Sequence, residues 1–302
     1  MKKSFLIILA ALLLTGIAFF REEHLFERPP EYLSGVRAYK DLAYVAKGHI
    51  RQKLDLYVPE SGEGPLPLIV WIHGGAWKEG SKEYCPPLPW VEKGYVIASI
   101  NYRLCQDAHF PAQIEDCKAA VRWLRTHARE YRIDPNRIVG WGDSAGGHLA
   151  SLLGTTGDIA DWEQGHPVGS SRLQVVIDWY GRADLACVST DPAYADSPIA
   201  MLLGGSGPDF ADEAQSASPI RHISKEDPAF LIMHGDKDGV VPVEQSVAFA
   251  AALRQGGVKA KLVILKGAGH GGREFLASEE VTTIDTFLIE HLGPRKTAQP
   301  HP

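Results

Sequence analysis

Cysteine is scarce in this chain, with only four among its 302 residues. No Cys-X-X-Cys pair occurs and the spacings match no zinc-binding pattern, which excludes a zinc-finger type of site. Buried free thiols and one or two disulfide bonds are both compatible with an exported chain. The spacing indicates no pairing among Cys85, Cys105, Cys117 and Cys187.

An excess of basic charge is also absent. The chain has 31 Lys and Arg residues against 37 Asp and Glu residues, a formal net charge of −6. Proteins that bind nucleic acid usually carry a basic face, so we expect no nucleic-acid partner. The chain also lacks long runs of like charge, internal repeats and low-complexity blocks. Its hydrophobic content of 45% and charged content of 23% are ordinary for a soluble globular protein with a sizeable core.

Long apolar runs are missing except near the N-terminus, where one extends from Phe5 to Phe20. It follows Lys2 and Lys3 and is shorter than the roughly 20 residues of a membrane-spanning helix. Residues 1–18 are therefore predicted to be a signal peptide or, if uncleaved, a membrane anchor. The lysines argue against a buried core helix. We expect export to the periplasm or the cell exterior, with membrane contact only through an uncleaved segment.

Strand and helix patterns alternate from about Asp41 onward. Alternating apolar and polar residues predict a strand at Leu54–Pro59, and Asp134–Gly142 is predicted to be a turn followed by a short strand. Short apolar runs predict further strands at Leu66–Gly75, Gly94–Arg103, Leu173–Gly181, Ala229–Gly235 and Ala260–Gly267. Apolar residues at helical spacing predict helices at Pro111–Tyr131, Val243–Gln255 and Glu279–Leu292. This alternation predicts an α/β fold with a mostly parallel central sheet and helices on both faces. We expect the first strands, before His73, to be antiparallel.

The pattern defines one main domain over residues 41–293, preceded by a leader segment at 19–40 and followed by a disordered tail at 294–302. Residues 186–227 break the rhythm, since they are rich in Ser, Pro, Asp and Gly and carry only a weak helix signal at Ser197–Gly205. Long irregular insertions in compact domains are usually functional or mobile. We therefore expect a cap-like insertion there.

Ser144 lies within "GDSAG", which matches the Gly-X-Ser-X-Gly pattern. The pattern follows an apolar strand and opens a helix, which is the context of a sharp turn that exposes a nucleophilic serine. Gly142 and Gly146 allow the turn without side-chain clashes. The turn also directs the amide of Ala145 toward an incoming carbonyl oxygen. A glycine-rich helix start is the ordinary alternative.

A nucleophilic serine also needs donors for the developing oxyanion. The sequence "HGGAW", from His73 to Trp77, follows a buried strand at the position where open α/β sheets bind ligands. Gly74 and Gly75 leave their amides free to face such a ligand. A simple β-turn is the alternative interpretation.

The base and its orienting acid are sought after the last strands. "GAGHGG" places His270 on a glycine-rich loop at a strand end, which makes it a candidate general base. "HGDKDGVVP" places Asp236 and Asp238 on the preceding strand-end loop, and either could orient a histidine. We expect His73 and His234 to hold loops.

These motifs resemble those of the α/β-hydrolase superfamily, and more narrowly of hormone-sensitive-lipase-like esterases and bacterial feruloyl or acetyl-xylan esterase-type hydrolases. The resemblance implies Ser144 as nucleophile, Asp238 as acid and His270 as base, in that chain order. It also implies an oxyanion hole formed by the amides of Gly74, Gly75 and Ala145.

One residue departs from the lipase-like pattern, because Ala76 stands where those relatives often carry a third glycine. The sequence therefore leaves open which amide completes the oxyanion hole. "HGGAW" is also similar to a motif of arylformamidases. That similarity suggests that Trp77 lines a substrate pocket.

Together these features predict a serine carboxylic-ester hydrolase that works through an acyl-enzyme and needs no metal or organic cofactor. Its expected substrates are short-acyl or feruloyl esters, either small molecules or derived from polysaccharides. An amidase, formamidase or peptidase on the same residues is the enzymatic alternative. A non-catalytic ligand-binding protein on a hydrolase scaffold is the alternative from another class.

Overall fold

The computed structural model describes residues 34–62, 64–157, 162, 169–186 and 195–293. The predicted signal segment, the predicted tail and Cys187 lie outside these residues. From Gly35 onward the described chain builds one sheet in the order β1-β2-β4-β3-β5-β6-β7-β8. Its strands are β1 (Val36–Ala43), β2 (Lys53–Pro59), β3 (Leu66–Ile72), β4 (Val96–Ile100), β5 (Ile133–Asp143), β6 (Val175–Trp179), β7 (Ala229–Gly235) and β8 (Ala260–Leu265).

The sheet is parallel from β4 to β8, and among the described strands only the pairs β1–β2 and β2–β4 are antiparallel. The central strand β3 is buried along its whole length, because helices cover both of its faces. The mostly parallel sheet confirms the predicted α/β fold.

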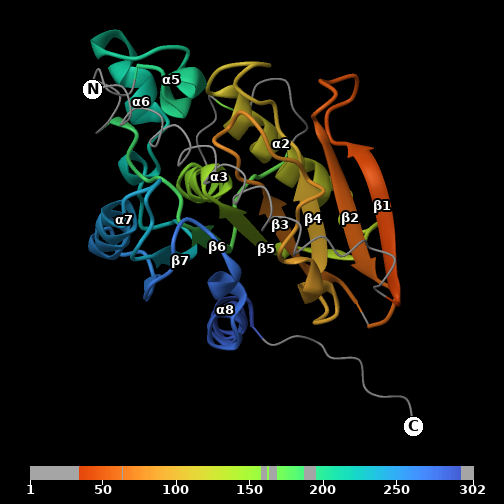
Figure 1. Cartoon of the computed structure of the whole chain (residues 1–302). Helices are drawn as coiled ribbons and strands as arrows, with labels where there is room; N and C mark the ends of the chain where they lie inside the picture. The colour runs from red at the N-terminus through yellow and green to blue at the C-terminus, as the bar shows by residue number, and fades with distance from the viewer. Residues whose placement is uncertain (1–33, 63, 158–161, 163–168, 187–194, 294–302) are drawn as a thin grey trace, which may run out of the picture. The chain divides into compact units, whose positions relative to one another are not determined.

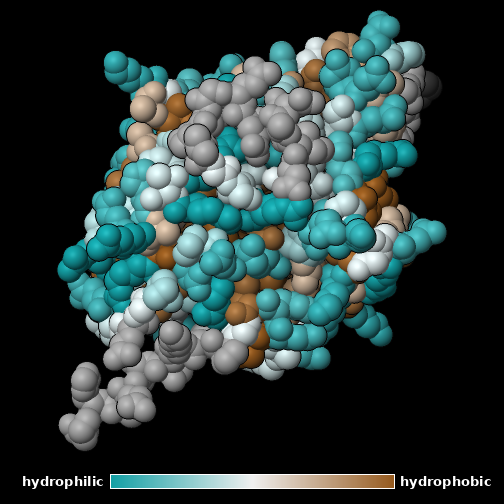
Figure 2. All heavy atoms as spheres, turned by 180° about the vertical axis from the view of Figure 1, so that it is seen from behind, coloured by the Kyte–Doolittle hydropathy of each residue, from teal (hydrophilic) through white to brown (hydrophobic). Residues whose placement is uncertain are grey.

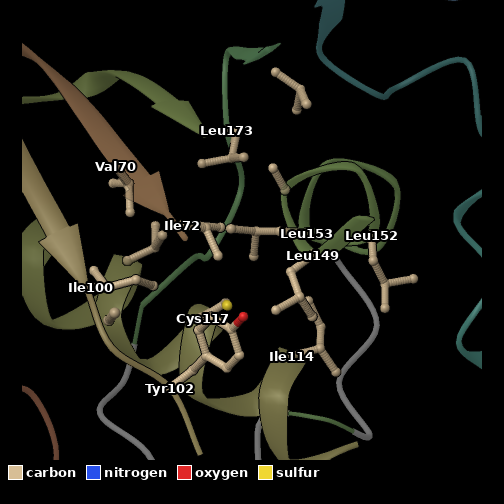
Figure 3. Packing of buried hydrophobic residues seen from close by; sticks show 14 of the residues in the cluster. Val70, Ile72, Ile100, Tyr102, Ile114, Cys117, Leu149, Leu152, Leu153 and Leu173 are labelled. Carbon is tan, nitrogen blue, oxygen red and sulfur yellow. The ribbon is translucent and has the colours of Figure 1, made fainter. Parts of the chain in front are cut away.

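Helices lie on both faces of the sheet, as predicted (Figure 1). On one face, a cluster of buried hydrophobic side chains packs three helices against the strands: α2 (Ala112–Thr126), α3 (Ala145–Thr155) and α7 (Glu244–Gln255). Figure 3 shows this cluster, in which Ile114 of α2 and Leu149 of α3 pack with Val70 and Ile72 of β3.

Tryptophans occupy the opposite face of the sheet. Side chains alternate along a strand, so Trp71 of β3 points away from Val70 and Ile72. Its ring meets those of Trp141 and Trp179 edge-on at centroid distances of 6.4 and 6.0 Å. On this face α8 (Ser278–Leu292) contacts β6 and β7. Asp285 of α8 accepts a hydrogen bond from the indole of Trp90, in the short helix η3 (Leu88–Val91).

Two sequence expectations need correction. β1 begins at Val36, inside the predicted leader, and therefore the domain starts before residue 41. This strand lies at the edge of the sheet and its side chains are exposed or half-buried, so it carries no apolar run that predicts a strand. β3 was expected to be antiparallel because it precedes His73, but it runs parallel to β4 and β5. The chain crosses over through η3 before it enters β4.

The described part of the insertion is more regular than predicted. It contains α5 (Pro198–Leu203), α6 (Ala211–Ser216) and the single turns η6 (Pro208–Phe210) and η7 (Pro219–Arg221). α5 is stabilised at its start because the hydroxyl of Ser197 accepts a hydrogen bond from the amide of Ala200. It ends at Gly204, whose left-handed φ of 85° suits glycine. The weak helix signal at Ser197–Gly205 is thus confirmed.

The outer surface seen from behind is mostly hydrophilic, and apolar residues lie in small patches between polar ones (Figure 2). The large hydrophobic side chains that are exposed in the described chain are Ile50, Met201, Val240, Val247, Ile264 and Ile289. In the described residues no helix is both long and apolar enough to cross a lipid bilayer.

Candidate active site

Ser144 lies at the turn between β5 and α3 in a backbone conformation that is rare for L-residues, with φ of 51° and ψ of −116°. Its amide donates to the carbonyl of Trp179 at 2.8 Å, and its own carbonyl accepts from the amide of His148 at 2.9 Å. Its side chain caps no amide of the helix. A strained residue held by its surroundings is typical of functional sites, and here the hydroxyl is left for another partner.

Two glycines make this turn possible. A β-carbon on Gly146 would lie 1.9 Å from the carbonyl oxygen of Ile72, and one on Gly142 would lie 2.3 Å from the backbone of Gly146. The start of α3 therefore packs directly against the end of β3. The predicted need for glycine on both sides of Ser144 has a steric cause, which is the close approach of three backbone segments.

Three side chains from loops after β5, β7 and β8 form a continuous hydrogen-bonded relay. Nε2 of His270 lies 2.8 Å from Oγ of Ser144, and Nδ1 of His270 lies 2.7 Å from Oδ2 of Asp238. An ionised carboxylate only accepts hydrogen bonds, so Nδ1 of His270 carries the proton and Nε2 accepts the hydroxyl of Ser144. In this arrangement His270 can remove the proton from the serine.

The surroundings of Asp238 keep its carboxylate charged and in place to accept the hydrogen bond from His270. Its Oδ1 accepts the amides of Val240 and Val241, each at 2.8 Å. Its Oδ2 also lies 3.1 Å from Nε2 of the buried His234. Burial opposes ionisation, but the bonds with His234 and His270 outweigh it and hold the pKa of Asp238 well below 3.8. The carboxylate is therefore charged at neutral pH.

Asp236, the other aspartate considered for the acid, has a different partner. Its Oδ1 accepts the amide of Gly267 at 2.6 Å, which ties the loop after β7 to the end of β8. Within the described chain, only Asp238 of the two aspartates contacts His270. Asp236 stabilises the loop that carries the histidine.

The predicted oxyanion donors differ in their availability. The amide of Gly74 already donates to Oδ1 of Asp143 at 2.7 Å, so its predicted role as an oxyanion donor does not fit the structure. Within the described residues, the amides of Gly75, Ala76 and Ala145 donate to no acceptor. An oxyanion could therefore be bound between the amide of Ala145 on one side and the amide of Gly75 or of Ala76 on the other.

His73 holds the loop that follows β3, as expected. Nε2 lies 3.2 Å from the guanidinium of Arg51, which only donates, and thus Nδ1–H donates to the carbonyl of Gly74 at 2.7 Å. The ring stacks on Tyr102 at 4.4 Å between centroids. Burial lowers the pKa of His73 to about 3, so the ring stays neutral and keeps both bonds.

Trp77 does not line an open pocket, contrary to the sequence expectation. The residue is only 5% exposed and belongs to the core, and its indole N–H donates to Nδ1 of His148 at 3.1 Å. Nε2–H of His148 in turn donates to the carbonyl of Ala217, at the end of α6, at 2.7 Å. His148 thereby joins the loop after β3, the helix after Ser144 and the insertion.

Sequence reasoning missed two residues beside the relay. Asp143 precedes Ser144, and its side chain accepts a hydrogen bond from the amide of Gly74. Tyr180 follows β6 with a left-handed φ of 44°, and its ring packs edge-on against His270 at 4.7 Å between centroids. The position of Tyr180 just beyond the end of a parallel strand was the signal that could have found it, because ligands bind at that edge of such sheets.

The described cysteines are free. Cys105 and Cys117 are buried and Cys85 is half-buried, and none of the three forms a disulfide. Burial raises the pKa of the Cys85 thiol to about 12 and also raises those of Cys105 and Cys117. The described residues contain no group of His, Cys, Asp or Glu side chains able to hold a metal ion.

A pocket of about 300 Å³ lies away from the relay. Leu173 and Pro228, which precede β6 and β7, line it together with Arg172 and His222. It is thus at the amino ends of the strands, whereas Ser144, Asp238 and His270 follow their carboxyl ends. The hydrogen-bonded side chains of the candidate site therefore lie on the loops at the carboxyl edge of the sheet.

Residues 54–253 of the chain match the model of the BD-FAE family. Esterase LipC of Mycobacterium tuberculosis is 33% identical over 214 residues, which are 68% of this chain and 53% of LipC. The chain spans about half the length of the curated relatives it matches.

Solved structures resemble the chain over most of its length. A truncated carbohydrate esterase from gut microbiota matches with a TM-score of 0.79 and 30% identity, over 85% of this chain and 97% of that one. An acetyl ester-xyloside bifunctional hydrolase from Caldicellulosiruptor lactoaceticus matches with a TM-score of 0.67 and 31% identity, over 80% of this chain and 88% of that one.

Proposed function

The chain belongs to the BD-FAE family of α/β-hydrolases, and from this premise we propose that it is a serine carboxylic-ester hydrolase. The observation that carries the proposal is the relay in which His270 lies 2.8 Å from the hydroxyl of Ser144 and 2.7 Å from the carboxylate of Asp238. This geometry supplies a nucleophile, a general base and an orienting acid in hydrogen-bonding contact.

In the proposed reaction, Oγ of Ser144 attacks the ester carbonyl carbon while Nε2 of His270 takes the hydroxyl proton. The tetrahedral intermediate collapses as His270 gives that proton to the leaving alcohol, which leaves an acyl group on Ser144. A water molecule then attacks this acyl-enzyme while Nε2 of His270 takes its proton. His270 gives that proton to Oγ of Ser144 as the second tetrahedral intermediate collapses, which releases the carboxylic acid and restores the serine hydroxyl. Asp238 keeps the proton on Nδ1 and stabilises the imidazolium.

The oxyanion of both tetrahedral intermediates is bound by backbone amides in this proposal. Ala145 supplies one donor, and Gly75 or Ala76 supplies the other, because these amides donate to no acceptor in the described chain. Each such donor contributes about 3 kcal/mol to the stability of the transition state. Gly74 is not a donor, since its amide is taken by Asp143.

The proposed substrates are short-acyl esters of carbohydrates. Support comes from the structural resemblance to a carbohydrate esterase and to an acetyl ester-xyloside hydrolase. Turnover of acetylated xylan should exceed that of a feruloylated sugar, N-formylkynurenine and a proline peptide when the four are compared at equal concentration. Preferential turnover of the formamide or the peptide would favour the amidase alternative.

We also propose that the protein is exported, because two lysines precede the apolar run from Phe5 to Phe20. Exported enzyme would meet polysaccharide esters outside the cytoplasm. Cell fractionation with sequencing of the mature N-terminus tests this. Full-length protein confined to the cytosolic fraction would overturn it.

Replacement of the nucleophile tests the proposed function. Ser144→Ala should lower kcat for p-nitrophenyl acetate by at least about 10⁴-fold. Ser151→Ala is the matched control, since Ser151 lies on the same helix and its hydroxyl donates to Asp178 instead of to His270. A fluorophosphonate probe should label the wild type on Ser144 and leave Ser144→Ala unlabelled. Retained hydrolysis by Ser144→Ala would overturn the proposal.

A further inference from the structure

Asp143 lies where the nucleophile turn meets the loop after β3. Its Oδ1 accepts the amide of Gly74 at 2.7 Å. A β-carbon on Gly74 would lie 2.9 Å from Oδ2 of Asp143 and 3.0 Å from its carbonyl oxygen, so the two segments touch. Gly74 directly precedes Gly75 and Ala76, the loop residues whose amides are proposed to bind the oxyanion. The bond between Gly74 and Asp143 therefore fixes the start of this loop relative to Ser144.

Tyr180 connects the same carboxylate to the histidine. Burial and the neighbouring side chain of Asp143, through its charge and a hydrogen bond, raise the pKa of the Tyr180 hydroxyl. The ring of Tyr180 packs edge-on against His270, at 4.7 Å between centroids, and the residue as a whole is 5% exposed. A β-carbon on Gly271 would lie 3.3 Å from the hydroxyl oxygen, so the histidine loop passes directly over it.

Tyr180 is itself held in an unfavourable conformation. Its φ is 44°, which is rare for a bulky residue, and its amide donates to the carbonyl of Met233 at 2.9 Å. Phe275 supports the ring from another side at 4.7 Å. Because backbone strain of this kind persists only where surrounding contacts enforce it, the placement of the ring between Asp143 and His270 is well determined.

The charge of Asp143 needs such partners. A carboxylate next to the nucleophile repels the negative charge that develops on the substrate oxygen. Hydrogen bonds from the amide of Gly74 and the hydroxyl of Tyr180 occupy the carboxylate and hold it in place. The same two bonds tie the oxyanion loop and the histidine loop to one side chain.

Building on the proposed function, we propose that Asp143 and Tyr180 act together as positioning residues that hold the loop of Gly75 and Ala76 in register with Ser144 and His270. They touch neither substrate nor proton in the reaction. Their effect is on the alignment of the oxyanion donors, which matters in the transition state more than in substrate binding.

The test compares Asp143→Ala, Asp143→Asn and Tyr180→Phe with the wild type on p-nitrophenyl acetate. Asp143→Ala should lower kcat by about 10- to 100-fold with KM within about threefold, because only transition-state alignment is lost. Affinity for a trifluoromethyl ketone, which forms a tetrahedral adduct with the serine, should fall by a similar factor. Asp143→Asn keeps an oxygen for the amide of Gly74, so it should retain more activity than Asp143→Ala.

A double-mutant cycle tests whether the two residues act as a unit. Tyr180→Phe combined with Asp143→Ala should lose about as much kcat as Asp143→Ala alone, since the hydroxyl has no role once the carboxylate is gone. Additive losses would overturn the coupling. Tyr180→Phe and Asp143→Asn are close in shape to the natural residues and carry the test if Asp143→Ala does not fold.

Matched controls separate positioning from stability. Asp227 also accepts a backbone amide, that of Ser224 at 2.9 Å, but it lines the distant pocket. Tyr44 is buried and donates its hydroxyl to Asn101 at 2.7 Å. Asp227→Asn and Tyr44→Phe should keep kcat within about twofold of the wild type.

Two results would overturn the proposal. In the first, kcat of both Asp143→Ala and Tyr180→Phe stays within about twofold of the wild type. In the second, the control variants lose as much kcat as these variants, and the loss in each protein is proportional to the fall in its Tm. Ser144→Ala in the same assay separates the two proposals. If Ser144→Ala is inactive while Asp143→Ala is fully active, the positioning role fails and the proposed function stands. If Ser144→Ala stays active, the proposed function fails.

Discussion

Nε2 of His270 lies 2.8 Å from Oγ of Ser144, although the two residues are 126 positions apart in the chain. They meet because β5 and β8 run in the same direction within one parallel sheet, which brings the loops after both strands to the same edge. The contact depends on the whole sheet between the two strands.

Asp238→Asn should lower kcat by about 10³-fold or more, because an amide at this position no longer holds the proton on Nδ1 of His270. Asp236→Asn is the matched control from the same loop, since its carboxylate binds the amide of Gly267. It should change kcat by less than about threefold. Steady-state kinetics on p-nitrophenyl acetate measure both. Equal losses in the two variants would contradict the assignment of Asp238.

The free energy of unfolding should fall as the pH is lowered from 6.5 to 4, partly because of His148. Burial lowers the pKa of this residue from 6.5 to about 4 in the folded state. Over this range the unfolded chain binds a proton that the folded chain does not, so the unfolded state is favoured. His148 alone contributes a loss of about 3 kcal/mol by pH 4, and the buried His73 adds to the same trend.

Urea denaturation at several pH values measures this slope. His148→Gln removes the titrating ring, so the decline between pH 6.5 and 4 should be shallower than in the wild type, whatever its stability at neutral pH. His49→Gln, at a histidine whose side chain is 38% exposed, is the matched control. Equal slopes for wild type and His148→Gln would show that His148 does not carry the effect.

Gly146→Ala should destabilise the protein by about 3 kcal/mol or more, or prevent folding, because a backbone carbonyl occupies the space of the new methyl group. The added β-carbon would lie 1.9 Å from the carbonyl oxygen of Ile72. Gly239→Ala is the control, since in the described residues no atom beyond its own chain neighbours lies within 4 Å of the added carbon. It should change the free energy of unfolding by less than about 0.5 kcal/mol. Thermal and urea unfolding of both variants measure the difference.

Trp77→Phe should destabilise the fold by about 1–3 kcal/mol, because Nδ1 of the buried His148 loses its donor. KM for p-nitrophenyl acetate should stay within about twofold, since the indole is in the core. Unfolding in urea and steady-state kinetics are measured on the same preparation. A large rise in KM with unchanged stability would restore the pocket-lining role expected from the sequence.

The motifs at the strand ends could be predicted from the sequence because each depends on residues that are neighbours in the chain. An apolar run predicts a parallel strand, and glycines after it predict a turn at the sheet edge. These two signals located Ser144, His270 and both candidate aspartates. They could not separate Asp236 from Asp238, because the two lie on one loop and differ only in which distant loop each side chain meets.

The edge strand β1 is the part of the fold that could not be predicted from the sequence. Its side chains are exposed or half-buried, so neither apolar runs nor alternation mark it, and only pairing with β2 defines it as a strand. Of the short helices in the insertion, α5 gave only a weak signal and the others gave none, for a related reason. Their few turns depend on caps and on packing more than on periodicity.

The sequence by itself determined the alternation of strands and helices, the glycines required at the turn around Ser144, and the order of the residues that form the relay. Only the tertiary structure decided which groups were already occupied. It showed that the amide of Gly74 donates its hydrogen bond to Asp143 and that the indole of Trp77 donates to His148. The physical reason is that a donor or acceptor is available for chemistry only when no other buried group has satisfied it, and those partners lie 69 and 71 positions away.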